Sequence, residues 1–414
     1  MNLKGLAKGA IWGALQWPLF RGLQPRMLHT NSFLLEGKTK NSLSLSLLVF
    51  SNYENIVHYI SKLAFSEEPK IELLKRVSYH NMLSVESRVK PDLIFGEFPG
   101  TICSFLSQSF LVLPRVNFSL DISRPIEQIL GNMMQLRRRS FRKIEVNSYV
   151  YESTKDPADF KQFYQNIYLP FTSKSKRDSF SRLIPFGVME KWFLSGELLL
   201  VKLNGARLAG LLNHPESSGT VHCRVIAYSE GLAAQAALYH LIKEAKKDGY
   251  KTINYGASSP FMSDGLFFYK KSLGMETEFR DFGSVFGLKI CNFEKPARDF
   301  IVSNHFLFTN FESMIGLATL VKPGEVVNLS SIRHDHYVRG LDRLLVIYPR
   351  AGKIQNEGFS SNLSFQTTLG GIDLFIKLVR SANYEIGFLD FEVTSHNLNS
   401  DRKMHQGSVS DFQN

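Results

Sequence analysis

TVHCRVIAYSEGLAAQAALYHLIKEAKKDGYKTINYGASSPFMSDGLFFYKKSLGMETE, residues Thr220 to Glu278, is the stretch of sequence that decides the fold. Its first part, Thr220 to Ser229, is rich in β-branched residues and alternates in a way that predicts a largely buried strand. The alternation places Val221, Cys223 and Val225 on one face and His222, Arg224 and Ile226 on the other.

A helix is predicted after this strand. Ser229 suits its N-cap, and the apolar stripe that follows ends at Asp248-Gly249. A second short strand, Lys251 to Tyr255, leads into a turn, and Asp264-Gly265 opens another helix before a last strand. The stretch thus predicts one compact α/β unit. A helix that begins at a strand end offers free backbone amides to anions, which points towards a phosphate-bearing donor.

The composition indicates a folded protein with several domains. The chain has 414 residues, of which 44% are hydrophobic, enough for two or three domains. Its three cysteines are widely spaced, which suggests neither a disulfide framework nor a zinc cluster. The formal net charge of +11 favours acidic partners at long range. No run of eighteen apolar residues occurs, so we expect no transmembrane helix. The cysteine pattern favours a reducing compartment, and we expect a cytoplasmic location. Two interpretations of the basic N-terminus stay open: peripheral contact with the inner face of the membrane, and an ordinary helix packed on the core, which has about twice the weight.

Outside the central stretch the sequence also predicts a mixture of strands and helices. We expect a strand over Asn41 to Ser51 and a helix over Asn52 to Ala64, and Asn204-Gly205 predicts a tight hairpin. Between them lies a helix with a basic end, Arg137 to Lys143, for which a solvated face and a polyanion site are equally weighted. Beyond Gly283 we expect a helix over Phe300 to Leu320, a strand over Leu344 to Tyr348, a helix over Gly371 to Ser381 and a strand over Glu385 to Val393.

These ordered features resemble the GNAT-fold acyltransferases, and more narrowly the FemAB-like group with its BioF2-like acetyltransferase domains. The resemblance covers about residues 105 to 285, and its most specific part is INYGASSPFMSDGLFFYKKSLGM with Lys270, Lys271 and Gly274. It implies an α/β (α+β) fold, a GNAT-like mixed sheet flanked by helices, with two tandem GNAT-like halves as an option. The expected parts are a basic segment at 1-40, a degenerate GNAT-like domain at 41-130, the acyltransferase domain at 131-295, a C-terminal α/β extension at 296-394 and a disordered tail at 395-414.

The resemblance also implies an enzyme, an N-acyltransferase that moves an acyl or aminoacyl group to an amine of a sugar, an amino acid or a cell-envelope or polysaccharide precursor. The donor is acyl-CoA as a co-substrate or aminoacyl-tRNA, and neither DNA nor a metal is expected. One departure stands at the pyrophosphate loop, where Glu230 occupies a position that a phosphate would approach. The expected residues are Tyr269, Asp264, Arg224 and Tyr255 for catalysis; Ile226, Ser229, Gly231, Leu232, Ala233 and Ala234 for the donor; and His222, Ser258, Ser259, Lys270 and Lys271 for the acceptor.

Each candidate also has a structural interpretation. Tyr269 could protonate the leaving group or fill the core, and Asp264 could accept a proton or cap the next helix. Polar residues on a central strand, such as Arg224 and His222, are often satisfied by neighbours. The cluster Arg333 to His336 is interpreted as a surface loop rather than a metal site. The alternative for the whole protein is a catalytically silent GNAT-fold scaffold that binds an anionic partner or a membrane surface.

Overall fold

The computed structural model describes most of the chain between residues 29 and 390. The described residues are 29–78, 81–99, 109–175, 183–216, 219–278, 284–309, 314–319, 327–328, 332, 335–350, 354–355, 359–360, 377–382 and 384–390. The tail expected at 395-414 and most of the basic segment at 1-40 lie outside them, as does the first half of the helix expected over Gly371 to Ser381.

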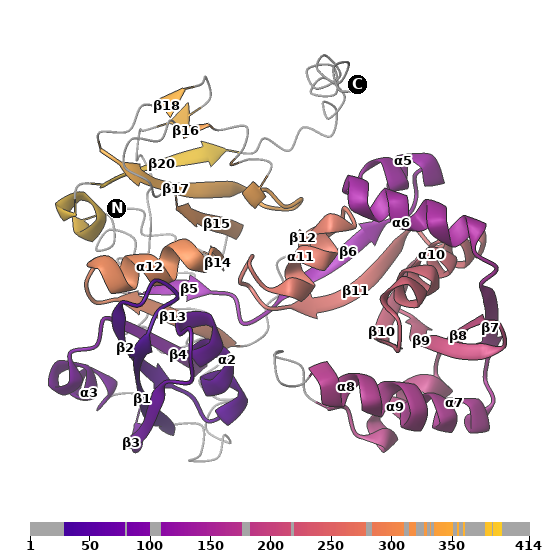
Figure 1. Ribbon diagram of the computed structural model, residues 1–414, viewed down its shortest axis with the longest axis horizontal. Coiled ribbons are helices and arrows are strands. Elements are labelled where there is room, and N and C mark those ends of the chain that lie inside the picture. The colour runs from indigo at the N-terminus through magenta and orange to yellow at the C-terminus, as the bar shows by residue number, and fades with distance from the viewer. Residues whose placement is uncertain are drawn as a thin grey trace, which may run out of the picture.

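Two mixed sheets carry the fold, and Figure 1 shows them side by side with their helices. The larger sheet has eleven strands among the described residues, in the order β19-β20-β17-β15-β14-β5-β13-β4-β2-β1-β3. Its strands are β1 (His29–Lys38), β2 (Ser44–Phe50), β3 (Lys70–Ser78), β4 (Leu93–Pro99), β5 (Phe110–Val112), β13 (Ser284–Ile290), β14 (Phe306–Thr309), β15 (Met314–Thr319), β17 (Arg343–Pro349), β19 (Phe359–Ser360) and β20 (Tyr384–Asp390).

The smaller sheet has seven described strands, in the order β12-β6-β11-β10-β9-β8-β7. They are β6 (Val116–Asp121), β7 (Val150–Thr154), β8 (Glu197–Leu203), β9 (Ala206–Pro215), β10 (Thr220–Tyr228), β11 (Thr252–Ser258) and β12 (Glu276–Glu278). A separate pair joins β16 (Val327–Asn328) to β18 (Ile354–Gln355). The predicted fold class, mixed α/β with helices flanking mixed sheets, is thus confirmed.

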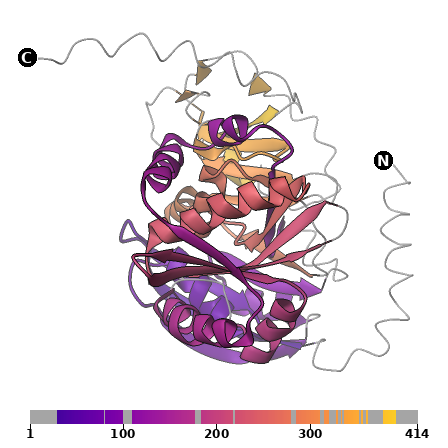
Figure 2. The same cartoon turned by 90° about the vertical axis from the view of Figure 1, so that its right-hand side faces the viewer.

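Helices cover both faces of the smaller sheet, as Figures 1 and 2 show. One face packs on α10 (Gly231–Lys247), α11 (Gly265–Ser272), α5 (Ile126–Gly131) and α6 (Gln135–Val146). The other packs on α7 (Pro157–Phe163), a π-helical turn η3 (Tyr164–Tyr168), α8 (Leu169–Ser175) and α9 (Phe186–Leu194). In the larger sheet, α2 (Glu54–Ala64) and α12 (Lys295–Ser303) cover one face and α3 (Met82–Val89) the other.

Both sheets contain the same local arrangement. In each, an antiparallel pair is followed by a helix, and a later strand lies parallel to the second of the pair: β9, β10, α10 and β11 in one, and β1, β2, α2 and β4 in the other, where β3 and α3 are inserted between α2 and β4. This repetition is what tandem halves would produce. Strand β6 belongs to the smaller sheet, and the boundaries expected at residues 130 and 295 stay a prediction.

The hairpin predicted at Asn204-Gly205 is confirmed. Strands β8 and β9 pair up to Leu203 and Ala206, and the two turn residues have φ of 51° and 79°. Positive φ at both central positions is the geometry that Asn-Gly favours. The turn fixes the register of β9, and β9 in turn pairs with β10.

Three sequence predictions were wrong in detail. The helix expected over Phe300 to Leu320 ends at Ser303, and β14 and β15 follow it, because this apolar segment is buried in the larger sheet. The strict alternation along β10 is broken by a bulge between Cys223 and Val225. Ser229 does not cap α10; its hydroxyl bonds to the Leu208 carbonyl, and Glu230 is the N-cap residue.

The strands expected over Leu344 to Tyr348 and Glu385 to Val393 are confirmed as β17 and β20, with a shift at the ends.

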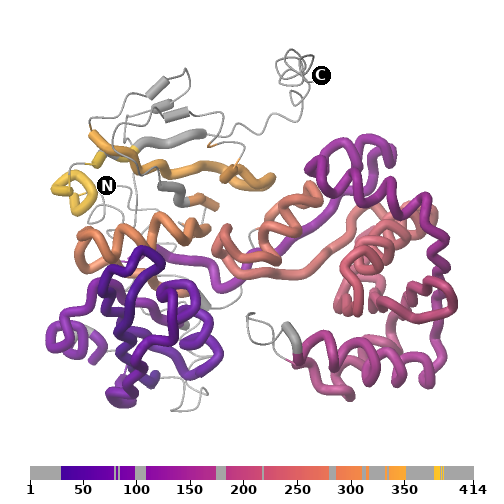
Figure 3. The backbone as a smooth tube through the Cα atoms, in the orientation of Figure 1, coloured from indigo at the N-terminus to yellow at the C-terminus, as the bar shows by residue number. Residues whose placement is uncertain are grey.

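Figure 3 shows the backbone passing between the two sheets at β5–β6 and again near α11. The β11–α11 connection touches the larger sheet: the Met262 amide donates to the His305 carbonyl at 2.7 Å, and Leu307 donates to Pro260 at 2.9 Å. Part of the smaller sheet's own chain is therefore positioned by the larger one.

Candidate active site

The parallel strands β10 and β11 separate shortly after they begin. Their described register covers three pairs, from Thr220↔Thr252 to His222↔Asn254, while both strands run on for several residues. Figure 1 shows β11 turning towards α11 and β10 towards α8. The facing backbone edges beyond Asn254 therefore do not form a regular ladder in the described structure. Unpaired strand edges can bind an extended ligand through main-chain hydrogen bonds.

A bulge in β11 shapes the open end. The register of β11 against β6 shifts between Asn254 and Ala257. Gly256 has φ of 69°, and its amide donates to the Asn254 side-chain oxygen at 3.0 Å. The Gly256 carbonyl accepts a hydrogen bond from the Lys270 ammonium of α11 at 2.9 Å. The bulge is thus fixed from within its own strand and from the following helix.

Lys270 is buried, with 2% of its surface exposed. Its ammonium nitrogen lies 5.3 Å from the ring centroid of Phe118 and 5.8 Å from that of Tyr255. Burial lowers the pKa of Lys270 to about 7, and the nearby Cys223 and Asp264 oppose that shift. A pKa near neutrality brings both the charged and the neutral form within reach, so this group can accept or donate a proton.

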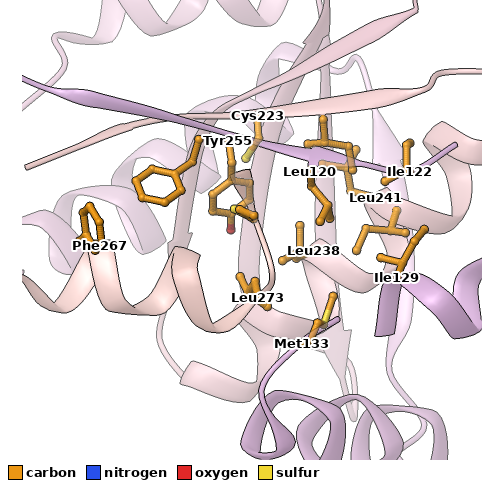
Figure 4. Close-up of a cluster of buried hydrophobic side chains, with 14 of the residues drawn as sticks. Leu120, Ile122, Ile129, Met133, Cys223, Leu238, Leu241, Tyr255, Phe267 and Leu273 are labelled. Carbon is orange, nitrogen blue, oxygen red and sulfur yellow. The ribbon is translucent and has the colours of Figure 1, made fainter. Parts of the chain in front are cut away.

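Two tyrosines lie near this lysine, on the face of the sheet that α10 and α11 cover: Tyr255, whose ring is 5.8 Å from the ammonium, and Tyr269, whose hydroxyl is close to that of Tyr255. Burial raises the pKa of Tyr269 to about 12, and burial also raises that of Tyr255 strongly. Each hydroxyl influences the pKa of the other, so the two are neighbours, yet neither makes a hydrogen bond of normal geometry within the described residues. Figure 4 shows Tyr255 between Cys223 and Leu273 in the hydrophobic core of the smaller sheet.

The two hydroxyls act on each other as hydrogen-bonding neighbours, and buried hydroxyls without a bond of normal geometry are rare. Burial raises the pKa of the Cys223 thiol to about 12, so this cysteine stays uncharged and lines the site as an apolar residue. The Arg137 guanidinium of α6 stacks on the Tyr269 ring at 4.6 Å, and its Nε donates to the Ser272 hydroxyl at 2.8 Å. One residue of the predicted basic cluster thus belongs to this site.

The loop between β11 and α11 places the next predicted residues. Asp264 is the N-cap of α11, and its carboxylate accepts from the amides of Leu266 at 2.9 Å and Phe267 at 3.1 Å. The structural interpretation of Asp264 is therefore confirmed. The hydroxyl of Tyr59, from α2, contacts the Ser259 hydroxyl and lies 3.5 Å from the other Asp264 oxygen. Ser258 and Ser259 are both buried at this strand end.

The predicted donor residues surround the start of α10. Glu230 is the N-cap residue, and its side chain makes no capping hydrogen bond. Amides of the first turn therefore remain available to an anion. Nothing lies within 4 Å of a Cβ built on Gly231, whereas Ala233 and Ala234 are buried in the core. Leu232 and Ile226 pack on that core from its edge.

A second group of polar side chains lies on the opposite face of the sheet, towards α9. We call it the β9–β10 cluster; it consists of Trp192, His214, Glu216, His222 and Arg224. Arg224 lies 3.0 Å from His214 through Nη2 and Nε2, and its guanidinium faces the Trp192 ring at 5.6 Å. His222 Nδ1 lies 3.6 Å from Glu216, which also accepts from Asn254 at 3.1 Å.

Lys271 lies away from both groups. Its ammonium donates to the Asp335 carbonyl, and burial lowers its pKa to about 8. Among the residues expected in the site, the structure therefore brings Tyr255, Tyr269 and Lys270 together on one face, and Arg224 and His222 together on the other. Within the described chain, no group of three His, Cys, Asp or Glu residues is arranged to hold a metal ion.

Sequence reasoning missed five contributors to these groups, namely Tyr59, Arg137, Trp192, His214 and Glu216. Only Arg137 had a local signal, as the first residue of the basic cluster. His214 faces His222 across the β9–β10 pair, which could have been found only from the register. Tyr59 is 205 residues from Asp264, and nothing local marks that contact.

Comparisons with known proteins give weak matches to solved structures. No protein-family model matches the chain, and no curated protein matches it by sequence. FemX is similar at 14% identity and a TM-score of 0.35, covering 61% of this chain and 83% of its own. L-PGS from Bacillus licheniformis is similar at 11% identity and a TM-score of 0.32, and the match covers 65% of this chain and 88% of that one. A GNAT family acetyltransferase from Elizabethkingia anophelis with acetyl-CoA bound is similar at 16% identity and a TM-score of 0.23, and the match covers 34% of this chain and 97% of that one. FemAB-like and GNAT proteins, which the sequence resembles, are thus among the similar structures.

No helix among the described residues is both long and apolar enough to cross a membrane.

Proposed function

We propose that the protein is an N-acyltransferase that moves an acyl or aminoacyl group from a thioester or ester donor to an amine. The observation that carries this proposal is the separation of β10 from β11 beside Tyr255, Tyr269 and Lys270. An acyl group laid along the open strand edges would have its carbonyl close to these side chains. Acyl transfer mostly requires such positioning, together with proton donors for the leaving group.

The reaction then needs three movements. The acceptor nitrogen attacks the donor carbonyl carbon and forms the new C–N bond, and the bond from that carbon to sulfur or oxygen breaks. Tyr269 gives its proton to the departing thiolate or alkoxide. A pKa near 12 keeps this hydroxyl protonated at neutral pH, as a general acid requires.

The proton lost by the attacking amine must also leave the site. Lys270, with a pKa near 7, can take it when neutral, and the ammonium can then return a proton to Tyr269. The charged form also favours the oxyanion that develops on the carbonyl. Arg137, stacked on the Tyr269 ring, stabilises the phenolate that forms briefly.

The donor fits the start of α10 in part. The uncapped first-turn amides suit a phosphate, whereas the Glu230 carboxylate would repel one. Acyl-CoA and aminoacyl-tRNA both remain donors to test, and the acceptor is proposed to be a sugar, an amino acid or an envelope precursor.

The test is transfer by the purified full chain, with labelled acyl-CoAs and charged tRNA as donors and amines of each acceptor class. With an accepted pair, Tyr269→Phe is expected to lower kcat by about 100-fold or more while KM changes little. Tyr239→Phe is the matched control, because the Tyr239 hydroxyl bonds to Glu145 outside the site. Unchanged kcat in Tyr269→Phe would refute the assigned role.

The scaffold alternative has its own outcome. Arg139, Arg142 and Lys143 are exposed on α6. If no donor and acceptor pair reacts, but neutralising these three cations abolishes binding to anionic vesicles, the protein is a scaffold rather than an enzyme.

A further inference from the structure

The β9–β10 cluster holds charges of both signs on one small area of the sheet. Arg224 and His222 are two residues apart on β10, while His214 and Glu216 are two residues apart at the end of β9. All five side chains of the cluster are half-buried. Arg224 Nε and Nδ1 of both histidines are themselves buried, whereas the Glu216 side chain is 34% exposed.

Arg224 has no acidic group in direct contact, although the charge of the nearby Glu216 partly opposes the lowering of its pKa by burial. Among the described residues it forms no ion pair within 4.0 Å, and its Nε is buried without a hydrogen-bond acceptor. Burial, followed by the charge of Arg224, lowers the pKa of His214, so that imidazole is neutral and its Nε2 can accept from the guanidinium. The remaining guanidinium N–H groups can bind a carboxylate or phosphate, which match their geometry.

Glu216 is held a short distance along the same strand pair. One carboxylate oxygen accepts from Asn254 at 3.1 Å, and the other lies 3.6 Å from His222. Its side chain is 34% exposed. It therefore offers a fixed negative charge to an incoming ammonium group, next to an imidazole that can accept a proton.

Neighbouring residues of β10 reach both faces of the sheet. Cys223 packs in the core with Tyr255, on the face of the donor site, and the next residue, Arg224, contacts α9 on the other face. Both lie at the point where β10 and β11 separate. A molecule held by Arg224 and Glu216 would reach the donor carbonyl from the opposite side of the sheet.

We propose that the β9–β10 cluster binds an acceptor whose amine is accompanied by an anionic group, with the anion at Arg224 and the ammonium at Glu216 and His222. This inference rests on the proposed acyl transfer and deepens it, because it limits the acceptor to amines that carry a carboxylate or a phosphate. Neutral amino sugars without such a group would be poor acceptors.

The first arm of the test measures binding without transfer. Replacing Trp12 and Trp17 by Phe leaves Trp192 as the single tryptophan of the chain, so its fluorescence reports the cluster. Glycine and O-phosphoethanolamine are titrated beside glycinamide and ethanolamine, which keep the amine and lack the anion. We expect the anionic member of each pair to bind at least tenfold more tightly, and the stronger pair identifies carboxylate or phosphate as the preferred group.

Variants assign that preference. Arg224→Leu should reduce the ratio between anionic and neutral probes to about one, while Arg224→Lys keeps part of it. Arg207→Leu is the control, since Arg207 is on β9 but pairs with Asp159. Equal binding of charged and neutral probes to the parent chain, or an unchanged ratio in a folded Arg224→Leu, would overturn the inference.

A second arm measures kcat/KM for the same four amines with an accepted donor. If transfer fails everywhere but binding depends on Arg224 as expected, the anion site stands and the enzymatic proposal falls. If transfer occurs with no preference for anionic amines, the enzymatic proposal stands and this inference falls.

Discussion

Replacing Lys270 by Met tests the burial of this charge directly. Met has a similar length and no charge, so it keeps much of the packing around Phe118 and Tyr255. The ordinary lysine pKa of 10.5 falls to about 7 in the folded chain. Between these two values the unfolded state binds more protons than the folded state, so stability rises with pH across that window.

The size of the effect follows from the two pKa values. Below pH 7 both states are protonated, and the buried ammonium costs about 5 kcal/mol. At pH 9 the folded lysine is already neutral and the remaining cost is about 2 kcal/mol. The lost hydrogen bond to the Gly256 carbonyl offsets about 1 kcal/mol of any gain in the variant, with little dependence on pH.

The expected result is therefore a pH-dependent gap. The free energy of unfolding of Lys270→Met should exceed that of the parent by about 3 kcal/mol at pH 7. At pH 9 this difference should be smaller by about 2 kcal/mol. The assay is urea unfolding at pH 7, 8 and 9, followed by Trp192 fluorescence in the Trp12→Phe, Trp17→Phe background and by circular dichroism. Coincidence of the two signals establishes that one transition is measured.

Lys247→Met is the matched control, because Lys247 is on the exposed side of α10. Its difference from the parent should be small at every pH. Lys271 is present in both the parent and Lys270→Met, so its own titration cancels in the comparison. A Lys270→Met gap that stays constant from pH 7 to 9, or that grows, would refute the burial of a charged Lys270.

Two further substitutions test how the two sheets are joined. Tyr59→Phe removes a buried hydroxyl that contacts Ser259 and Asp264; we expect a loss of about 1 kcal/mol in urea unfolding, and no loss would mean that the contact is not formed. Gly340→Ala would place a Cβ 2.0 Å from the Thr277 carbonyl oxygen at φ of 81°, and should cost at least about 3 kcal/mol. Gly205→Ala has a similar φ of 79° with nothing within 4 Å, and should cost only about 1 kcal/mol; equal losses would remove the steric explanation.

Local patterns predicted the smaller sheet well. The Asn204-Gly205 turn, the strand from Thr220 and the amphipathic helix from Gly231 are decided by neighbouring residues, and all of them are present, although the bulge interrupts the alternation along the strand. The segment after Gly283 was harder, because Phe306–Thr309 is apolar on both faces and has the same composition as a buried helix. Only pairing with β5 and β15 makes it a strand.

The residues of the candidate site also differ in how far the sequence could locate them. Tyr255, Tyr269 and Lys270 follow one another along a single strand-to-helix segment, so the resemblance could locate them. The burial of Lys270 could not be predicted, since a lysine near a helix end is ordinarily solvated. The β9–β10 cluster depends on strand register and on one bulge, and a shift of one residue would have moved Arg224 to the other face.

The contacts around the β11–α11 connection give a physical reason for the second sheet. A strand pair that separates loses the ladder bonds that would otherwise fix its open end. Here the lost restraint is replaced by the larger sheet, through the bridge between Phe261 and Phe306, the hydrogen bond from Met262 to His305, and Tyr59. Because α11 carries Tyr269 and Lys270, the larger sheet contributes to where these groups lie, together with the contacts of α11 to β6, β11 and α6. The β11–α11 side of the separation is therefore held by the larger sheet rather than by pairing with β10.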